Sequence, residues 1–248
     1  MKVAIITGGS RGIGKSIALN TGKRGIGVIL TYKSQKDDAL QVAKEIQQAG
    51  AKAVALQLDV EHIKSFEAFA LQIKSILRAE FEKDSFDFLV NNAGISGQRK
   101  AILDSTEEDF DQLVNVNLKG PFFLTQKLVP LLADGGQIIN ISSGLARFTF
   151  PNVSIYGSLK AALESFTRYF ATEFAQRKIR VNSVAPGAVD TEFGGGKDAM
   201  VIKHIAEKTA LGKMADAEDI GLFVASLLSD DSRFLNAQRI ELSGGFSI

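Results

Sequence analysis

The sequence contains no cysteine, and only two of its 248 residues are histidine. Without cysteine the chain can form no disulfide, no thiolate nucleophile and no thiolate zinc site. The two histidines, His62 and His204, lie far apart in the sequence and make a poor ligand set. We therefore expect chemistry that needs no metal, or at most a hard ion, and we assign no metal-binding residue.

Neither an excess of charge nor a long apolar run is present. The 29 basic residues are balanced by 28 acidic ones, so no global field attracts nucleic acid or anionic lipid, and neither partner is expected. The first apolar run, Val3 to Ile6, is too short for the core of a signal peptide, and no run approaches the length that spans a bilayer. The default expectation is a soluble cytoplasmic protein without a membrane partner.

Proline is also scarce, with four residues, and no Pro-rich or Ser-rich linker divides the chain, so we expect one domain over residues 1–248. Short runs rich in β-branched residues alternate with segments of helical period. Several runs are apolar throughout, which suits strands buried on both faces of a parallel sheet. The pattern predicts an α/β fold, a doubly wound sheet of about seven parallel strands with helices on both faces. The expected strands are Val3–Thr7, Gly27–Tyr32, Ala53–Leu58, Phe86–Asn91, Gln137–Ser142, Ile179–Val184 and Arg239–Leu242.

A glycine-rich loop follows the first predicted strand and precedes a helical run. Gly8, Gly12 and Gly14 let the backbone approach a phosphate, and the helix beyond offers free N–H groups and the positive end of its dipole. The stretch from Gly9 to Ser16 also fits the P-loop pattern. An ATPase or kinase, with Asp59 as a candidate magnesium ligand, therefore stays open at this point.

Five further side chains can take part in acid–base chemistry or support it. Tyr156 and Lys160 lie four apart on a segment of helical period, so both fall on one face. A nearby ammonium favours the phenolate and makes a tyrosine a usable general acid or base. Ser142 and Ser143 end the preceding strand, where neighbouring side chains point to opposite faces, so only one can face the site. Asn117 lies in an apolar helical stretch and either caps a bend or anchors a water near Lys160.

In this order the motifs resemble those of the short-chain dehydrogenase/reductase family, and the resemblance covers nearly the whole chain. The glycine spacing differs from the usual dinucleotide fingerprint and is similar to that of this family. Within it, the sequence looks closest to 3-oxoacyl-[acyl-carrier-protein] reductases. The matching pieces are Gly8, Gly12 and Gly14, then Asn91-Asn92-Ala93-Gly94, Asn117, Ser143, Tyr156 with Lys160, Pro186-Gly187 before Thr191, and Ser243-Gly244-Gly245 at the end.

The resemblance implies a Rossmann-type fold and a reductase that moves a hydride from NADPH to a carbonyl carbon. Tyr156 would donate the proton to the carbonyl oxygen. Ser143, which the family spacing selects, would hold that oxygen, and Ser142 would pack or cap. Lys160 would lower the pKa of the tyrosine and bond the nicotinamide ribose, and Asn117 would connect the lysine to solvent.

The second predicted strand ends in Tyr32-Lys33-Ser34, with no carboxylate to repel a 2′-phosphate, so we expect NADP(H) in preference to NAD(H). Arg11 and Lys33 could bind that phosphate, unless Lys33 is a solvated surface charge. Asp59 and Val60 resemble the family's adenine contact. The residues that the resemblance places at the cofactor are Gly8, Ser10, Arg11, Gly12, Ile13, Gly14, Tyr32, Lys33, Ser34, Asp59, Val60, Asn92, Ala93, Gly94, Tyr156, Lys160, Pro186, Gly187, Val189 and Thr191.

The expected substrate is a small carbonyl compound, with an acyl thioester on a carrier as one option. Arg99, Lys100 and Arg147 are candidate contacts for an acidic carrier, or are solvated surface charges. Residues 189–213 are expected to form a substrate lid, whose glycines at 194–196 either hinge it or form a plain loop.

The family implies a homotetramer, and the apolar segments 122–132 and 163–174 would suit its subunit faces. Residues 66–84 look longer than is usual for the family, which predicts an extended helix or a changed subunit contact. The other alternative to a reductase is a noncatalytic NADP-binding regulatory module. Such a module would normally have lost Tyr156 or Lys160, and both are present.

Overall fold

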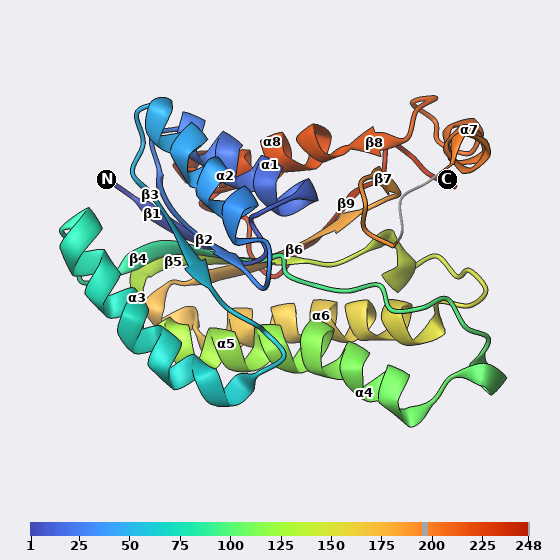
Figure 1. Cartoon of the computed structure of the whole chain (residues 1–248), viewed down its shortest axis with the longest axis horizontal. Coiled ribbons are helices and arrows are strands. Elements are labelled where there is room, and N and C mark those ends of the chain that lie inside the picture. Colours follow the sequence, from blue (N-terminus) through green and yellow to red (C-terminus); the bar gives the residue numbers. More distant parts are fainter. Residues whose placement is uncertain (195–197, 248) are drawn as a thin grey trace.

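Seven parallel strands form one sheet in the computed structural model, which describes residues 1–194 and 198–247 (Figure 1). Their order across the sheet is β3-β2-β1-β4-β5-β6-β9. This confirms the predicted doubly wound architecture and places every expected strand in the same sheet. The strands are β1 (Val3–Ile6), β2 (Gly27–Tyr32), β3 (Ala53–Gln57), β4 (Phe86–Asn91), β5 (Leu132–Ile141), β6 (Arg180–Pro186) and β9 (Arg239–Leu242).

Helices cover both faces of this sheet. Figure 1 shows α1, α2 and α8 on one face and α3, α5 and α6 on the other, with α4 beyond the second layer. The eight α-helices of the described residues are α1 (Gly12–Lys23), α2 (Lys36–Gln48), α3 (Phe66–Phe81), α4 (Glu107–Val114), α5 (Gly120–Leu128), α6 (Ser154–Glu173), α7 (Ala199–Glu207) and α8 (Ala217–Leu227). None of these helices is long and apolar enough to cross a membrane.

The apolar strands supply two cores at once, because successive side chains of a strand point to opposite faces. All four residues of β1 are fully buried. Ala4 and Ile6 pack in the core beneath α1, α2 and α8, whereas Val3 and Ile5 pack in the core beneath α3, α5 and α6. The prediction that this continuous apolar run forms a strand buried on both faces is therefore confirmed.

The structure corrects the region before the serine pair. The apolar segment 122–132 is not one helix, since α5 ends at Leu128 and a 3-10 turn containing Pro130 follows it. β5 then begins at Leu132 rather than Gln137, and its pairing with β4 shifts register between these two positions. Proline removes a backbone donor, which ends the helix there.

Two other segments differ from, or sharpen, the expectation. Residues 66–84 contain one helix, α3, which ends where Glu82 adopts left-handed backbone with a φ of +57°. A second small sheet joins β7 (Val189–Asp190) to β8 (Ala215–Asp216). Strands of two residues carry no periodicity, so this pair could not be predicted from the sequence pattern.

Candidate active site

A large pocket opens at the carboxyl ends of the parallel strands. Segments that follow β1, β2, β3, β4, β5 and β6 all contribute to its wall. Its volume of about 1960 Å³ exceeds the roughly 300 to 1,000 Å³ that is usual for one small ligand. The pocket therefore has room for a dinucleotide together with a second molecule.

The glycine loop after β1 forms one wall of the pocket, and its glycines are required for two different reasons. Gly8 and Gly12 have φ values of +66° and +54°, which L side chains rarely adopt. A Cβ on Gly14 would collide with the carbonyl oxygen of Gly8 and lie 2.5 Å from Asn92 Nδ2. The loop can fold closely against the start of α1 only because these side chains are absent.

The N-terminus of α1 is suited to an anion. The helix has no side-chain cap at Arg11 and no acidic residue in its first turn. By contrast, α4 and α8 begin with complete capping boxes at Thr106 and Asp216. The first N–H groups of a helix have no partner within it, and with the dipole they attract negative charge. The residues at this end of α1 thus fit a phosphate group of a dinucleotide.

Thr7 and Asn92 lock the glycine loop to the end of β4. Asn92 Nδ2 donates to the carbonyl oxygens of Thr7 at 2.9 Å and Gly8 at 3.2 Å. Thr7 Oγ1 in turn accepts from the backbone N–H groups of Asn92 and Ala93, both at 2.9 Å. Asn92 and Ala93 were predicted from their motif, whereas the role of Thr7 was not, because only the folded chain brings the two loops together.

Ser143, Tyr156 and Lys160 meet at the pocket from the end of β5 and the first turns of α6. The side chains of Ser143 and Tyr156 share a hydrogen bond. Lys160 is buried, and its Nζ donates to the carbonyl oxygen of Ile141 at 2.8 Å and lies 5.6 Å from the centre of the Tyr156 ring. Ser142 is also buried and bonds a carboxylate on α6 at 2.7 Å. The two serines are therefore separated as expected.

Burial controls the protonation of these groups. It raises the pKa of Tyr156 to about 12, although the hydrogen bond with Ser143 acts in the opposite direction. Burial likewise lowers the pKa of Lys160 to about 8, against the pull of the Glu164 carboxylate. The expected lowering of the Tyr156 pKa is not found, because desolvation of the phenolate outweighs the other effects. The tyrosine therefore keeps its proton at neutral pH.

Asn117 lies in a π-helical turn, Asn115–Lys119, between α4 and α5. Its side chain is buried and fully bonded: Oδ1 accepts from the Ile95 N–H at 3.2 Å, and Nδ2 donates to the Ile95 carbonyl oxygen at 3.0 Å and to a carbonyl oxygen one turn earlier. A Cβ on Gly94 would lie 2.9 Å from Asn117 Oδ1 and 3.8 Å from Lys160 Nζ. The structure thus places Asn117 beside Lys160 at a bend of the helix.

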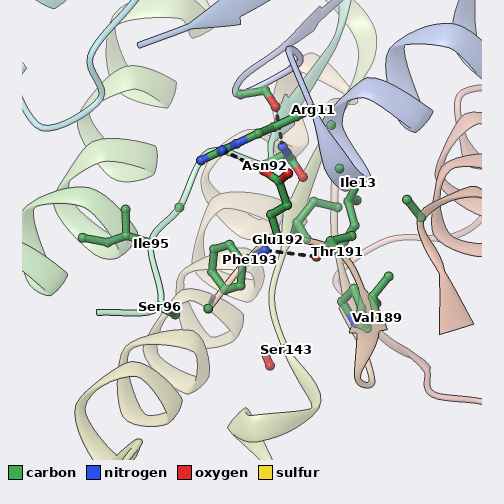
Figure 2. Close-up of a pocket in the computed structure, with 18 of the residues that line it drawn as sticks. Arg11, Ile13, Asn92, Ile95, Ser96, Ser143, Val189, Thr191, Glu192 and Phe193 are labelled. Atoms are coloured by element: carbon green, nitrogen blue, oxygen red, sulfur yellow. Dashed lines mark hydrogen bonds and ion pairs between the residues drawn. The ribbon is translucent and has the colours of Figure 1, made fainter. Parts of the chain in front are cut away.

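Both cations expected to bind a 2′-phosphate have carboxylate partners. Lys33 Nζ lies 2.8 Å from Asp59 and 3.2 Å from Glu61, and the hydrogen bond to Asp59 raises the pKa of Lys33. The sequence showed no carboxylate at the end of β2, but the fold brings two from the segment after β3. Figure 2 shows Arg11 reaching Glu192, a pair separated by 3.2 Å. The Arg11–Glu192 pair is exposed and therefore weak, so Arg11 can exchange its partner for another anion, whereas the Asp59 and Glu61 side chains at Lys33 are only 24% and 27% exposed.

Nearly all residues assigned to the cofactor line this pocket, together with Ser143. Tyr32 does not, because its side chain is buried in the core beneath α1 and α2. Asn117 lies behind the wall rather than in it. The predicted residues at the wall are Gly8, Ser10, Arg11, Gly12, Ile13, Gly14, Lys33, Ser34, Asp59, Val60, Asn92, Ala93, Gly94, Tyr156, Lys160, Pro186, Gly187, Val189 and Thr191.

The segment predicted as a lid, 189–213, also borders the pocket. The first two residues of this segment form β7, which pairs with β8, the strand that follows the end of the segment. Between them α7 begins at Ala199 and contributes Val201 and Ile205 to the wall. Of the glycines expected at the hinge, Gly194 lines the pocket, whereas positions 195 and 196 lie outside the described residues.

Four phenylalanines line the pocket, and one of them, Phe193, belongs to the segment predicted as a lid. Its ring lies 6.0 Å from the Tyr156 ring. Phe148 and Phe246 make an edge contact at 5.5 Å, and Phe150 lies 6.1 Å from Phe246. Phe150 and Phe193 are 43% and 46% exposed. Phe148, Phe150 and Phe246 are called here the aromatic wall. They come from the segment after β5 and from the C-terminal segment, and no local sequence pattern connects these two segments.

The doubly wound sheet, the glycine loop and the Ser–Tyr–Lys set at one edge define a Rossmann-type oxidoreductase. The profile of a family described as enoyl-(acyl carrier protein) reductase matches residues 8–247. A hydroxynaphthalene reductase-like protein of Metarhizium brunneum is 37% identical over 258 residues, covering 98% of this chain and 94% of that protein. A tetrahydroxynaphthalene reductase of Pestalotiopsis fici is 35% identical, and the match covers 98% of this chain and 91% of that protein.

Among solved structures, an angucycline C-6 ketoreductase with bound NADP superposes with a TM-score of 0.94. It is 34% identical, and the match covers 99% of this chain and 95% of the ketoreductase. The chain therefore belongs to the short-chain dehydrogenase/reductase family, which confirms the resemblance found in the sequence.

The P-loop interpretation is consequently wrong, and the side chains explain why the pattern misled. Lys15 pairs with Glu45 of α2 at 3.6 Å. The hydroxyl group of Ser16 donates to Glu218 of α8 at 2.9 Å. Both residues serve helix packing around α1, whereas a P-loop needs them at the phosphates and the magnesium ion.

The cost of burying Lys160 gives a testable prediction. We expect Lys160→Met to raise the free energy of unfolding at pH 7 by roughly 2 to 3 kcal/mol while abolishing activity. Burial lowers the pKa of Lys160 from 10.5 to about 8, so the unfolded chain binds the proton more tightly. The lysine's contribution to wild-type stability should therefore rise with pH between these two values. Urea unfolding at pH 7 and pH 10 measures the difference.

The advantage of the methionine variant should thus nearly vanish at pH 10. Lys44→Met, a change at an exposed lysine of α2, is the matched control and should leave stability unchanged at both pH values. A stability gain in Lys160→Met that is equal at both pH values would contradict the assignment of the cost to the buried charge.

Proposed function

We propose that the protein is an NADPH-dependent reductase of ketones or aldehydes, with Tyr156 as its general acid and base. The observation that carries this proposal is that Ser143, Tyr156 and Lys160 line the same pocket as the glycine loop and the start of α1. The names of the relatives, which are reductases, and the NADP held by the solved ketoreductase support it.

Bound NADPH would supply the hydride that reduces the carbonyl carbon. Tyr156, which keeps its proton at neutral pH, donates that proton from its Oη to the carbonyl oxygen. Ser143, hydrogen-bonded to Tyr156, holds the oxygen and stabilises the negative charge that develops on it. The ammonium of Lys160, 5.6 Å from the ring centre, stabilises the phenolate that remains. Asn117, beside Lys160, keeps its proposed place in the path of proton return.

The cofactor fits the residues present on two grounds. The closely folded glycine loop and the uncapped start of α1 suit a pyrophosphate. Arg11 and Lys33 both line the pocket, and their side chains are 63% and 61% exposed, so both can reach a 2′-phosphate bound there. We therefore propose NADP(H) in preference to NAD(H).

The aromatic wall favours a substrate whose ketone is carried by a flat, largely aromatic skeleton. Phe148, Phe150 and Phe246 line the pocket that contains Tyr156, and the exposed face of Phe150 is apolar surface in a concave site. Such surfaces gain free energy by covering an aromatic ligand. The relatives named for hydroxynaphthalenes and for an angucycline support this substrate class.

An acyl thioester on a carrier stays the alternative, but two of its three candidate cations are neutralised within the chain. Lys100 pairs with Asp109 at 2.5 Å, and Arg147 pairs with Glu241 at 3.2 Å. Only Arg99 has no ion pair among the described residues. The lid, the homotetramer and the cytoplasmic location are retained as proposals from the sequence.

The central test is Tyr156→Phe. We expect it to keep the fold and NADPH binding but to lower kcat for carbonyl reduction by about 10²- to 10⁴-fold, because a general acid is lost. NADPH oxidation is followed at pH 7 with a panel of ketones and aldehydes, and cofactor binding is measured by fluorescence. Tyr169→Phe, at an exposed tyrosine of the same helix, is the matched control. Tight NADPH binding without turnover of any carbonyl by either protein would favour the noncatalytic module.

Cofactor choice is tested with Arg11→Ala and Lys33→Ala. Each change should loosen NADPH binding about tenfold, since a charge-assisted contact to the 2′-phosphate is removed, and should change NADH binding by less than about twofold. Dissociation constants of both cofactors are measured by titration. Lys36→Ala removes a nearby exposed charge that does not line the pocket and serves as control. An equal loss for NADPH and NADH would count against the proposed phosphate contacts.

Substrate class is tested by comparing a bicyclic aromatic ketone, such as a tetralone, with an acetoacetyl thioester. Phe150→Ala should lower kcat/KM for the aromatic ketone about tenfold, because one face of the aromatic wall is removed, and should leave the thioester nearly unchanged. Phe234→Ala, at a fully exposed ring outside the pocket wall, is the control. A wild-type preference for the thioester, with no selective effect of Phe150→Ala, would restore the carrier-linked substrate.

A further inference from the structure

A buried carboxylate stands behind the Ser–Tyr–Lys set, and nothing in the proposed mechanism uses it. Glu164 lies on α6 one turn after Lys160 and is 9% exposed. Its Oε1 accepts from Ser142 Oγ at 2.7 Å and from Arg239 Nε at 2.9 Å. A buried charge is costly unless it is paired and bonded, so its presence next to the reacting groups requires a reason.

The geometry gives Glu164 a place in a clamp between β5 and α6. The carbonyl oxygen of Ile141 accepts from Lys160 Nζ at 2.8 Å. The next residue, Ser142, donates its hydroxyl hydrogen to Glu164. The residue after that, Ser143, shares a hydrogen bond with Tyr156. Three consecutive residues of the chain thus bond three side chains from three turns of one helix, and Glu164 anchors the middle one.

Glu164 also begins a series of alternating charges that leads away from the pocket. Arg239 on β9 bonds Glu164 through Nε and Glu241 through Nη1, both at 2.9 Å. Glu241 in turn pairs with Arg147, which is half exposed. Glu164 thus bonds the guanidinium of Arg239 on β9 and lies one helical turn after Lys160 on α6.

The charged and titratable groups around Glu164 come from two elements. On α6 they are Tyr156 and Lys160, which precede it, and Arg168, whose Nη1 donates to the Glu164 carbonyl oxygen at 3.3 Å. On β9 they are Arg239 and Glu241. The remaining side-chain partner, the Ser142 hydroxyl group on the segment after β5, carries no charge. On α6, Glu164 follows Lys160 by four residues and is the carboxylate nearest to it along the helix.

We propose that Glu164 is a positioning residue: it keeps Lys160 in its charged form and, through Ser142, fixes the end of β5 that presents Ser143. The inference rests on the proposed function for its catalytic consequence. The direction of the charge effect agrees with the electrostatics, since the carboxylate raises the pKa of Lys160 against the effect of burial.

The test reads Lys160 directly and without substrate. The protein is labelled with ¹³C at the lysine ε carbons, and the Lys160 signal is identified by its loss in Lys160→Met. Its chemical shift is then titrated between pH 6 and pH 11. In Glu164→Gln, which keeps the volume and the hydrogen bond to Ser142 but loses the charge, the midpoint should fall by about one pH unit. Glu164→Asp, which keeps the charge, should remain near the wild type.

A second variant predicts the opposite sign. Arg239→Gln removes the competing cation, so the carboxylate of Glu164 acts on Lys160 alone and the midpoint should rise. Glu173→Gln makes the same chemical change at an exposed position of α6 and should have no effect. Because the two sensitive variants move in opposite directions, general loosening of the fold cannot imitate the result. Failure of Glu164→Gln to fold would leave Arg239→Gln and Glu164→Asp to decide.

The catalytic consequence is measured from the dependence of kcat on pH. A fall of one unit in the midpoint should reduce the rate of Glu164→Gln about fivefold at pH 8 and leave it nearly unchanged at pH 6. An unchanged Lys160 midpoint in Glu164→Gln, or an equal loss of rate at every pH, would overturn the proposal. Absence of carbonyl reduction in the wild type would overturn the proposed function instead, and the titration would still decide the role of Glu164.

Discussion

The end of β5 is fixed to α6 through three consecutive residues, and the arrangement of the candidate site depends on that contact. Ile141, Ser142 and Ser143 bond Lys160, Glu164 and Tyr156 in turn. A strand alternates its side chains, whereas a helix repeats after about four residues. Ser143 therefore faces the pocket, whereas the neighbouring Ser142 points the other way and bonds the buried Glu164. The phenol and the ammonium group are thereby held on one helix, and the Ser143 hydroxyl group lies two residues after the end of β5.

The glycine loop is held in a comparable way, but by backbone rather than by charge. Thr7 and Asn92 close the gap between the ends of β1 and β4, and the missing side chain at Gly14 allows α1 to start against the loop. The unpaired N–H groups of that helix then face the pocket edge without a competing carboxylate in the first turn. Cofactor cradle and reacting groups therefore share the carboxyl edge of the sheet, where an open α/β sheet binds its ligands.

The site stores a large electrostatic cost. Lys160 and Glu164 are both buried, and burial lowers the pKa of Lys160 to about 8. Apolar side chains in these places would hold the two layers together as well or better. The cost is understandable if a charge is needed at the tyrosine, because a buried ammonium acts on a phenolate through little water. Stability and chemistry are thus opposed at this point of the fold.

The seven-stranded sheet and most of the pocket wall could be predicted from the sequence alone. Apolar runs such as Val3 to Ile6 indicate strands that are buried on both faces, and motifs such as Tyr156 with Lys160 have a fixed local spacing. The partners that come from distant segments are visible only in the folded chain: Glu61 at Lys33, Glu192 at Arg11, and the aromatic wall. Folding also buries Tyr32 in the core and raises the pKa of Tyr156. Periodicity shows which face of an element is buried, whereas contacts between elements and the desolvation of a group exist only when the whole chain is folded.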